Sequence, residues 1–506
     1  MDSKGGDYVG QEGARVQKTK WDERYSFNGA NVEQFPLASP PPLDVAATLD
    51  TQAQRVSEYL PAATCARATP TAATLAAARA KVEAARATMI ALQEELDWRC
   101  YRLYGLLDDA PEHPEPPALH LGQRAFEIVM ARQTQAGTLE TAWFSRHRST
   151  PITELPGHWP AAYRAVVERR IELIESNPSI GLIERPEYKR RWASAPWEEQ
   201  EQDALRIWLL DRLETQHYWP REQPGIQTTR TLADLARRDP DFCDVAALYA
   251  KTAVVDFDAL VATLVQREAV PFLAALRYSA TGLRKRADWE DTWDKQRQED
   301  AIDAAVEAER PAFAARALAE LGPLDAAAVE ARTTAFLAAE QRRRKNVEVG
   351  QIPVPPKYKT PDFRHVDLWR LRGGLDVPKE RFVSFPGAAP DTDGTLPVLW
   401  AGHLHLQRTQ ALAIWIMERR ERDGWLAARL APLLAGLLEL VPWLRQWHNG
   451  IDEETGLRMG IYYAEFVADQ ARTLGLTLDD LRGWTPPAPL RRGRGPARTL
   501  GRPSAA

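Results

Sequence analysis

Apolar residues recur at helical spacing through most of the chain. Leu75, Val82, Met89 and Leu96 follow one another at intervals of seven residues, which places them on one face of a helix spanning residues 72–107. The same pattern predicts helices over residues 43–60, 161–176, 197–217, 403–423, 425–447 and 460–474, with shorter helices near Leu232, Val245, Leu260 and residues 476–481. The expected fold class is therefore mainly α, with multi-helix domains.

Small β elements are expected near the start of the chain. Residues 21–27 alternate aromatic and polar side chains, which predicts a strand, and a second short strand is expected over residues 32–37, after the Asn28-Gly29 turn. Residues 1–20 have no period and are expected to form a loop. A strand pair is marginal by itself, so these strands resemble the end of a larger sheet.

Residues 354–387 depart from the alanine- and leucine-rich pattern of the helices. This stretch combines basic, aromatic, proline and glycine residues over a long run. Cations interleaved with flat rings can contact phosphates and stack on bases. The same composition is typical of a twisted hairpin packed on a helical body, and both interpretations stay open. In either case a small β element is expected here.

Prolines and glycines mark the expected loops and domain boundaries of the chain. Loops are expected at residues 61–71 and 177–192, and the proline-rich residues 111–117 form a predicted boundary. The predicted domains are residues 1–110 (the end of a recognition-like region plus long helices), 118–347 (helical), 348–484 (α+β) and 485–506 (a basic, disordered tail).

Composition limits the class of protein further. The 506 residues carry a net charge of −5, which argues against a uniformly basic coat but not against a local basic groove. Three cysteines, far apart, favour a reducing compartment without disulfides. The apolar run at 426–444 is interrupted by charges and prolines, so we expect a cytoplasmic protein with no membrane partner.

Four basic-aromatic runs are the candidate DNA contacts. Each places cations beside a ring or a second cation, as phosphate binding and base stacking require. Basic runs can also be purely structural: the cations of residues 342–345 are expected in a last helical turn, where they offset the helix dipole. The candidates are Lys189, Arg190, Arg191 and Trp192; Arg284, Lys285 and Arg286; Lys357, Tyr358 and Lys359; and Trp369, Arg370 and Arg372.

Five stretches in one order resemble a known family. They are NGANVEQFPL at residues 28–37, LDWRCYRLYGL at 96–106, GLIERPEYKRRW at 181–192, GLRKRADWEDTWDKQR at 282–297, and PPKYKTPDFR with WRLRGGLDVPKERF between 355 and 382. Together they resemble the C-terminal part of the large adenine-specific DNA methyltransferases of bacteriophage exclusion (BREX) systems of the phage-growth-limitation type. The resemblance extends from about Trp21 to Trp484.

The resemblance implies a Rossmann-like catalytic domain that this sequence does not contain. Such enzymes hold S-adenosylmethionine on a glycine-rich loop and place a flipped adenine at a turn in which Asn, Asp or Ser is followed by Pro-Pro and an aromatic residue. The Pro-Pro pairs at residues 40–41, 116–117, 355–356 and 486–487 are not followed by an aromatic residue. No zinc-binding or phosphate-loop motif is present either. We therefore name no catalytic, cofactor or metal residue and expect the chain alone to be inactive.

Two functional hypotheses follow from these observations. In the first, the chain supports DNA recognition and docks other phage-defence proteins or a separate catalytic methyltransferase half. In the second, it is a helical scaffold that binds proteins without touching DNA, which suits the negative charge and, weakly, the 17 tryptophans. A decayed fragment without function is the third interpretation.

Overall fold

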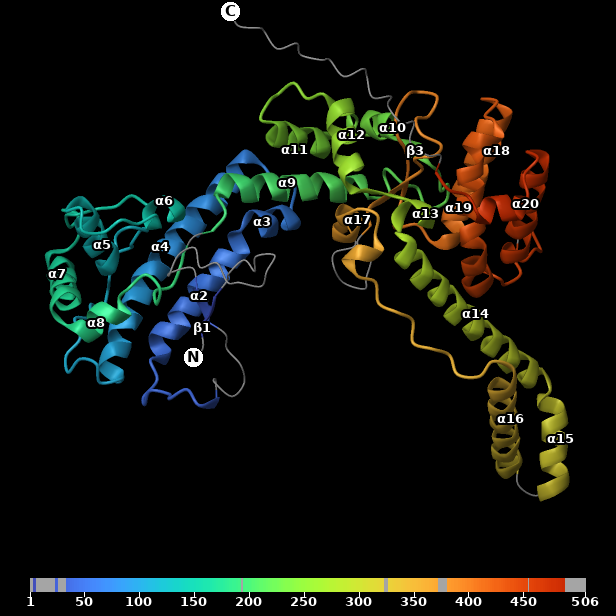
Figure 1. Cartoon of the computed structure of the whole chain (residues 1–506), viewed down its shortest axis with the longest axis horizontal. Helices are drawn as coiled ribbons and strands as arrows, with labels where there is room; N and C mark the ends of the chain where they lie inside the picture. The colour runs from blue at the N-terminus through green and yellow to red at the C-terminus, as the bar shows by residue number, and fades with distance from the viewer. Residues whose placement is uncertain are drawn as a thin grey trace, which may run out of the picture. The chain divides into compact units, whose positions relative to one another are not determined.

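The computed structural model describes residues 33–192, 194–322, 326–371, 380–453 and 455–486, together with the backbone of residues 3–5 and 23–25. The described chain is mainly helical with small β elements, which confirms the predicted fold class (Figure 1). It forms two compact units: unit 1 comprises residues 1–209 and 244–253, and unit 2 comprises residues 210–243 and 254–506. The domain boundaries expected from the sequence stay predictions.

Unit 1 is built around the long helix α4, Ala72–Leu103. The Thr71 hydroxyl accepts a hydrogen bond from the Thr74 N–H at 3.1 Å and so caps the start of α4. Gly105, with a φ of +68°, follows its end, as is common after helices. The other elements are β1 (Ser3–Gly5), β2 (Glu23–Tyr25), α2 (Leu43–Tyr59), α3 (Pro61–Arg67), α5 (Ala125–Gln135), α6 (Trp143–His147), α7 (Ala161–Ser176) and α8 (Pro178–Ile183). Helices α9 (Trp197–Leu213) and α11 (Pro240–Ala250) contain residues of both units.

Several local expectations for unit 1 are corrected. The strand expected over residues 21–27 is confirmed as β2, but its antiparallel partner is β1, within the expected loop 1–20. No strand occupies the described residues 33–37. The loops expected at 61–71 and 177–192 contain α3 and α8.

Both missed helices begin with a proline at a first helical position. Proline has no N–H to lose there and its φ already suits a helix. At α8 the Asn177 side chain also accepts hydrogen bonds from the N–H groups of Ser179 and Ile180 at 3.0 and 3.3 Å. We interpreted these prolines as loop markers, whereas they start helices.

Unit 2 contains a four-stranded sheet of order β3-β6-β5-β4. At its centre Val383 lies opposite Leu399 on one side and Val270 on the other, and all three side chains are buried. Among its described residues the stretch 354–387 contributes one strand, β5, which is the small β element expected there, and the antiparallel partner of β5 is β6, which lies beyond the stretch. The strands are β3 (Gln227–Thr228), β4 (Ala269–Pro271), β5 (Phe382–Ser384) and β6 (Pro397–Trp400).

Helices cover the sheet and form the main core of unit 2. The apolar helix α19, Ala427–Trp447, supplies much of it. Among the described helices, α19 alone is long and apolar enough to cross a membrane, with a mean hydropathy of 1.4 over its most apolar segment. In the fold 61% of that segment is buried. Core helices of soluble proteins meet the same criterion. The remaining helices here are α10 (Thr229–Ala236), α12 (Phe257–Glu268), α13 (Ala274–Arg277), α18 (His405–Glu421), α20 (Met459–Thr473) and α21 (Leu478–Arg482).

A helical arm leaves the body of unit 2 and returns to it (Figure 1). The arm consists of α14 (Ala280–Ala308), α15 (Arg310–Leu321) and α16 (Ala326–Glu348), and its far end has a small core around Ile302, Val306 and Leu337. The chain comes back through residues 351–359, here called the strap, into the 3₁₀ helix η2 (Thr360–Asp362) and α17 (Val366–Leu371).

The start and the end of this excursion meet. The Ser279 N–H donates to the Asp362 carbonyl at 2.9 Å, and Tyr278 pairs with Phe363 in an antiparallel bridge. A Cβ on Gly282 would lie 2.0 Å from the Asp362 carbonyl oxygen, so only glycine fits this close approach.

Candidate nucleic-acid interface

The first candidate cluster, in unit 1, is largely buried. The ammonium group of Lys189 lies 2.6 Å from an Asp97 carboxylate oxygen and 2.8 Å from one of Glu184. Only 2% of the Lys189 side chain is exposed. Burial opposes its charge, but the carboxylates of Asp97 and Glu184 outweigh burial and raise its pKa well above the ordinary value. Lys189 is thus a structural cation and is not presented to a ligand on the surface.

The residues after Lys189 are divided between core and surface. Trp192 is buried in the core of unit 1 with Tyr163 and Ile171. Arg190 is exposed, and its guanidinium lies 4.6 Å from the centre of the Trp192 ring. Arg191 is half-buried. Arg190 is therefore the one candidate of this cluster whose side chain is fully at the surface.

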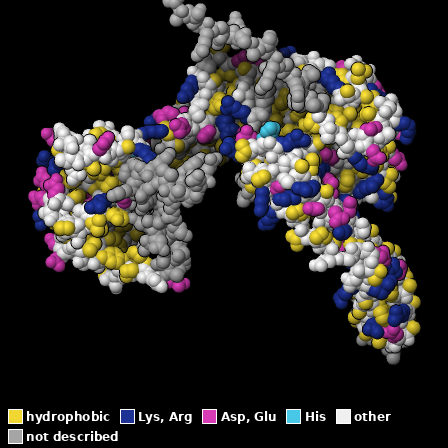
Figure 2. Space-filling view, viewed as in Figure 1, with side chains coloured by type: hydrophobic (Ala, Val, Ile, Leu, Met, Phe, Trp, Pro, Cys, Tyr) yellow, Lys and Arg dark blue, Asp and Glu magenta, His cyan; other side chains and the backbone are white. Residues whose placement is uncertain are grey.

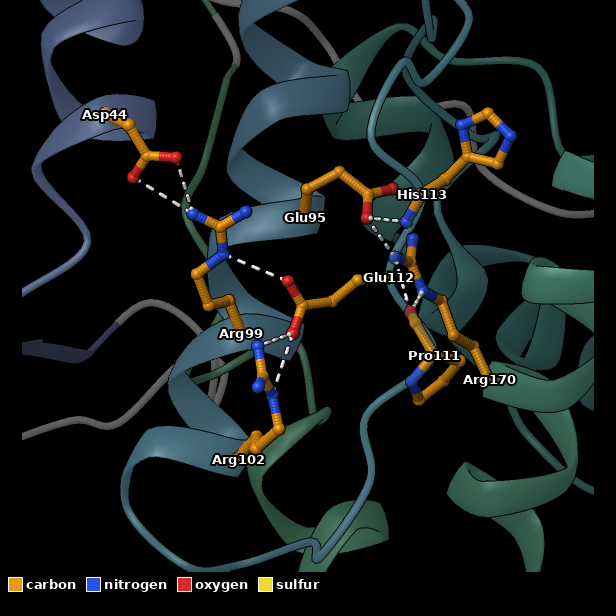
Figure 3. A network of polar contacts seen from close by, with 8 residues as sticks. All are labelled: Asp44, Glu95, Arg99, Arg102, Pro111, Glu112, His113 and Arg170. Carbon is orange, nitrogen blue, oxygen red and sulfur yellow. Dashed lines mark hydrogen bonds and ion pairs between the residues drawn. The ribbon is translucent and has the colours of Figure 1, made fainter.

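Buried arginines in unit 1 also bind carboxylates and backbone carbonyls. Arg170, whose side chain is fully buried, lies 2.6 Å from Glu95 and donates two hydrogen bonds to the Pro111 carbonyl at 2.8 and 2.9 Å. The same carboxylate accepts a hydrogen bond from the His113 N–H at 2.8 Å (Figure 3). Nearby, Arg99 joins Asp44 to Glu112, and Arg102 also pairs with Glu112. These contacts fasten residues 111–113 between α4 and α7.

The second and third clusters come together in unit 2. Lys285 of α14 forms an ion pair with Asp362 at 2.6 Å and donates to the Lys357 carbonyl at 2.9 Å. The strap is held further because the Trp289 indole N–H donates to the Pro356 carbonyl at 2.9 Å. Residues that are more than 70 apart in sequence therefore share one surface.

This shared surface, here called the basic face, consists of Arg284, Lys285, Lys357 and Lys359. Arg284, Lys357 and Lys359 are exposed. Among the described residues, no carboxylate forms an ion pair with Arg284 or Lys359. Lys and Arg side chains gather on this side of unit 2 near the start of the arm in Figure 2. Together with the half-buried Lys285, they form a compact positive surface suited to phosphates.

The aromatic candidates of unit 2, Tyr358 and Trp369, pack against other rings of the protein. Tyr358 stacks on Tyr278, with ring centroids 5.0 Å apart and an interplanar angle of 20°. Trp369 packs against Phe363 at 5.5 Å and is half-buried. These rings stabilise the point where the strap rejoins the body.

The remaining basic candidates differ from one another. Arg370 is exposed and lies 3.4 Å from Asp367. Arg372 lies outside the described residues. Arg286 is bound to Glu290 at 2.8 Å and to Glu439 at 2.9 Å. Burial opposes the charge of Arg286, but Glu439 and Glu290 outweigh burial and raise its pKa. Its role is to join α14 to α19.

An aromatic cavity next to the basic face was missed. Its lining includes Trp289, Trp293, Trp443 and Arg408. The spacing of Arg286, Trp289 and Trp293 places all three on one side of α14. This stripe of one cation and two rings could have indicated part of the cavity from the sequence. Nothing in the sequence pairs that stripe with Trp443 or Arg408. Within the part of the chain that the structure describes, no group of three His, Cys, Asp or Glu side chains could hold a metal ion.

The architecture and charges define a mainly helical protein with small β elements and a local basic surface. The domain of unknown function DUF7008 matches residues 89–496, and the chain belongs to this family. The chain is also similar to the adenine-specific methyltransferase PglX of Streptomyces coelicolor, with 44% identity over 505 residues. That similarity covers 98% of this chain and 38% of PglX. It confirms the resemblance to adenine-specific methyltransferases, and the chain spans little more than a third of that relative. No solved structure matches.

Proposed function

We propose that this chain is the DNA-contacting, partner-docking part of an adenine-specific DNA methyltransferase of a phage-exclusion system. The observation that carries the proposal is the basic face, where Arg284, Lys357 and Lys359 lie together and exposed. Similarity to PglX supports DNA as the macromolecule involved. A catalytic half, outside the sequence described here, would bind S-adenosylmethionine and transfer the methyl group in the cytoplasm.

The residues expected to contact phosphate are fewer than the sequence suggested. Arg284, Lys357, Lys359 and Arg370 combine exposure with positive charge, and Arg190 does so in unit 1. Arg286 forms an ion pair with the half-buried Glu439, and Lys189 forms one with the buried Glu184, so neither is expected to contact phosphate. Phosphate contacts position a protein on DNA without reading the sequence, so this face anchors the duplex and does not select the target site.

The test is DNA binding by the full chain and by a charge-reversed variant. Fluorescence anisotropy with a labelled duplex is expected to show affinity that falls steeply between about 50 and 200 mM salt, because bound phosphates release counterions. R284E/K359E should bind at least about ten-fold more weakly and reduce the salt slope by about two. R238E/R422E, which reverses two exposed arginines elsewhere in unit 2, is the matched control.

Two results would contradict the proposal. One is a purified chain without DNA affinity at low salt, and the other is equal loss of affinity in R284E/K359E and in the control. The proposal also expects no transfer of labelled methyl groups to DNA by this chain alone. Label in DNA would show that catalytic residues have been overlooked.

A second candidate function is protein binding by the arm. Leu318 and Leu321 on α15 are 46% and 51% exposed, and Val347 on α16 is 74% exposed. Exposed apolar side chains on a projecting helical pair favour the docking of another defence protein. Retention of that partner by R284E/K359E, with loss in L318D/L321D, would assign docking to the arm and DNA to the basic face.

A further inference from the structure

Unit 2 contains a cavity of about 610 Å³ between α14, the strap, α18 and α19. Three half-buried tryptophans, Trp289, Trp293 and Trp443, contribute to its lining. The rings of Trp293 and Trp443 meet edge to face with centroids 5.7 Å apart, and His405 lies parallel to Trp443 at 5.5 Å. A cavity of this size, lined by rings and a few charges, is typical of a small-molecule site.

Most charged side chains around the cavity are paired with one another. Arg277 pairs with Glu380 at 2.8 Å, and Arg286 pairs with Glu290 and Glu439. The third arginine, Arg408, lies within 4.0 Å of no carboxylate among the described residues. Burial lowers the pKa of His405 to about 4, so this ring is neutral at pH 7 and adds no charge. Arg408 is therefore the one of these three arginines that forms no ion pair with a described carboxylate, although Glu380 still favours its charged form from farther away.

The guanidinium of Arg408 is held in place but not neutralised. Its Nε donates to the His403 carbonyl at 2.8 Å, and one of its terminal nitrogens, Nη2, donates to the Ala401 carbonyl. The other terminal nitrogen, Nη1, makes no hydrogen bond to a described residue. Burial lowers the pKa of Arg408, the Glu380 carboxylate opposes this shift, and nearby Arg277 adds a smaller lowering effect. A half-buried charge without an ion pair has lost part of its hydration, and a bound anion would compensate for that loss.

We propose that this cavity binds a planar heteroaromatic ring that carries an anionic group, that is, a nucleotide. The base would lie among Trp289, Trp293 and Trp443, where stacking and edge contacts are available. The phosphate would lie at Nη1 of Arg408, because charged hydrogen bonds to phosphate are strong and directional for arginine. Both halves of the ligand are needed, since the rings attract the base and the arginine attracts the anion.

The nucleotide has two possible sources that share this chemistry. It is either free in solution or an unstacked nucleotide of a DNA strand held on the adjoining basic face. Lys357 and Tyr358 line the cavity and also belong to the candidate DNA contacts. In the second case the inference rests on the proposed function, and in the first it goes beyond it.

The first experiment measures nucleotide binding by the full chain. Deoxyadenosine monophosphate, deoxyadenosine and deoxyribose 5-phosphate are titrated by calorimetry, and a labelled single-stranded oligonucleotide is titrated by anisotropy. The monophosphate or the oligonucleotide should bind at least ten-fold more tightly than either half-ligand. R408M should lose at least ten-fold in affinity, whereas R422M, an exposed arginine directly after α18, should bind like the wild type.

A pair of tryptophan variants tests the stacking surface. W443L removes a ring that lines the cavity, and W197L removes a half-buried tryptophan of unit 1 that does not line it. Only W443L should weaken binding. R408M removes the charge and also the hydrogen bonds to the His403 and Ala401 carbonyls, so its thermal unfolding temperature is measured as well and its affinity is compared only at temperatures where it is folded.

The outcomes separate this inference from the proposed function. Loss of mononucleotide affinity in R408M identifies a free nucleotide as ligand, and loss of oligonucleotide affinity alone identifies a DNA strand. No binding of either probe to the wild type, or equal binding by R408M and R422M, overturns the inference. If the inference is overturned but R284E/K359E still abolishes duplex binding, the proposed DNA contact at the basic face is supported and the nucleotide site is not. If the mononucleotide binds through Arg408 and no DNA binds at all, the cavity stands alone.

Discussion

The basic runs at residues 189–192 and 284–286 resemble each other in sequence, but they have different surroundings in the two units. In unit 1, Lys189 is buried between the carboxylates of Glu184 and Asp97. In unit 2, Arg284 is exposed and has no ion pair among the described residues. The difference comes from Glu184, five positions before Lys189, and from Asp97, which is distant in sequence. A cation of a basic-aromatic run is therefore available to a ligand only where the fold pairs no acid with that cation.

Helix α4 is the reason that unit 1 neutralises its cations. The buried Glu94 and Glu95 and the partly buried Asp97 lie within one turn of this helix. Arg170 and Lys189 reach Glu95 and Asp97 from other segments. A buried carboxylate costs much free energy unless it is paired, so the acidic stripe and the cations depend on each other.

The largest expected effect comes from removing the buried cation of unit 1. Lys189→Met leaves Glu184 buried without its counter-charge, and we expect a loss of about 3–5 kcal/mol in the free energy of unfolding. Urea denaturation followed by circular dichroism measures it. Arg190→Met, one position along and exposed, is the control and should cost less than about 1 kcal/mol.

DNA binding sharpens the same comparison. Under conditions in which Lys189→Met is folded, it should bind a DNA duplex as tightly as the wild type does, because the Lys189 side chain does not reach the surface. Unchanged stability together with weakened DNA affinity would mean that Lys189 is a contact residue and that the contrast between the units is wrong.

A smaller effect is expected within unit 2, where two neighbouring arginines differ. Arg286→Ala leaves Glu439, which lies between α14 and α19, without its partner, and should destabilise the protein by about 1–3 kcal/mol. Arg284→Ala should change stability by less than about 0.5 kcal/mol, as exposed positions usually do, and should weaken DNA binding. Thermal unfolding and anisotropy on both variants decide this; equal stability losses would contradict it.

The smallest expected effect concerns pH and the strap. Burial alone would raise the pKa of Asp362, but hydrogen bonds from Lys285 and from the Lys359 N–H lower it below its ordinary value of 3.8. A lowered carboxyl pKa contributes stability that is present above pH 3.8 and is lost as the pH falls through the folded-state value. We therefore expect the strap to loosen at acid pH.

Hydrogen exchange of the strap amides, corrected for the intrinsic effect of pH, measures this loosening. Protection should fall below about pH 4, by less than about 1 kcal/mol, because the pair is partly exposed. Lys285→Met should already show reduced protection at pH 7 and a smaller additional loss in acid. A strap whose protection is the same in wild type and variant at both pH values would show that the pair does not hold it.

The helices were predictable because their signals are local. Residues 161–176 form α7 with both ends as expected, since Pro160 precedes the helix and the apolar spacing is continuous. The sheet was not predictable in the same way. Its strands have two to four residues, too few to show alternation, and Gln227 of β3 pairs with Val398, far along the chain.

The candidate site was predictable only in its charges. The sequence identified Arg284 and Lys359 as cations beside rings, but their exposure depends on where acids do not lie. The sequence could not reveal that an ion pair with Asp362 holds the strap at Lys285. It also could not reveal that Arg286 pairs with Glu439 and is therefore not free to contact DNA. Pairing energies depend on burial and on partners distant in sequence, and neither is encoded in a local run of residues.

The meeting of Ser279 with Asp362 also has an evolutionary consequence. Because the arm departs and returns at one closed junction, held in part by the close approach of Gly282, its length is independent of the body's topology. Helical turns added or deleted beyond Asp300, which accepts a hydrogen bond from Gln446 of α19, would leave the sheet and α19 undisturbed. The arm can therefore behave as an exchangeable cassette, because its length can change at the tip without altering its base. The same property makes the connection between α15 and α16 a suitable place to insert a reporter.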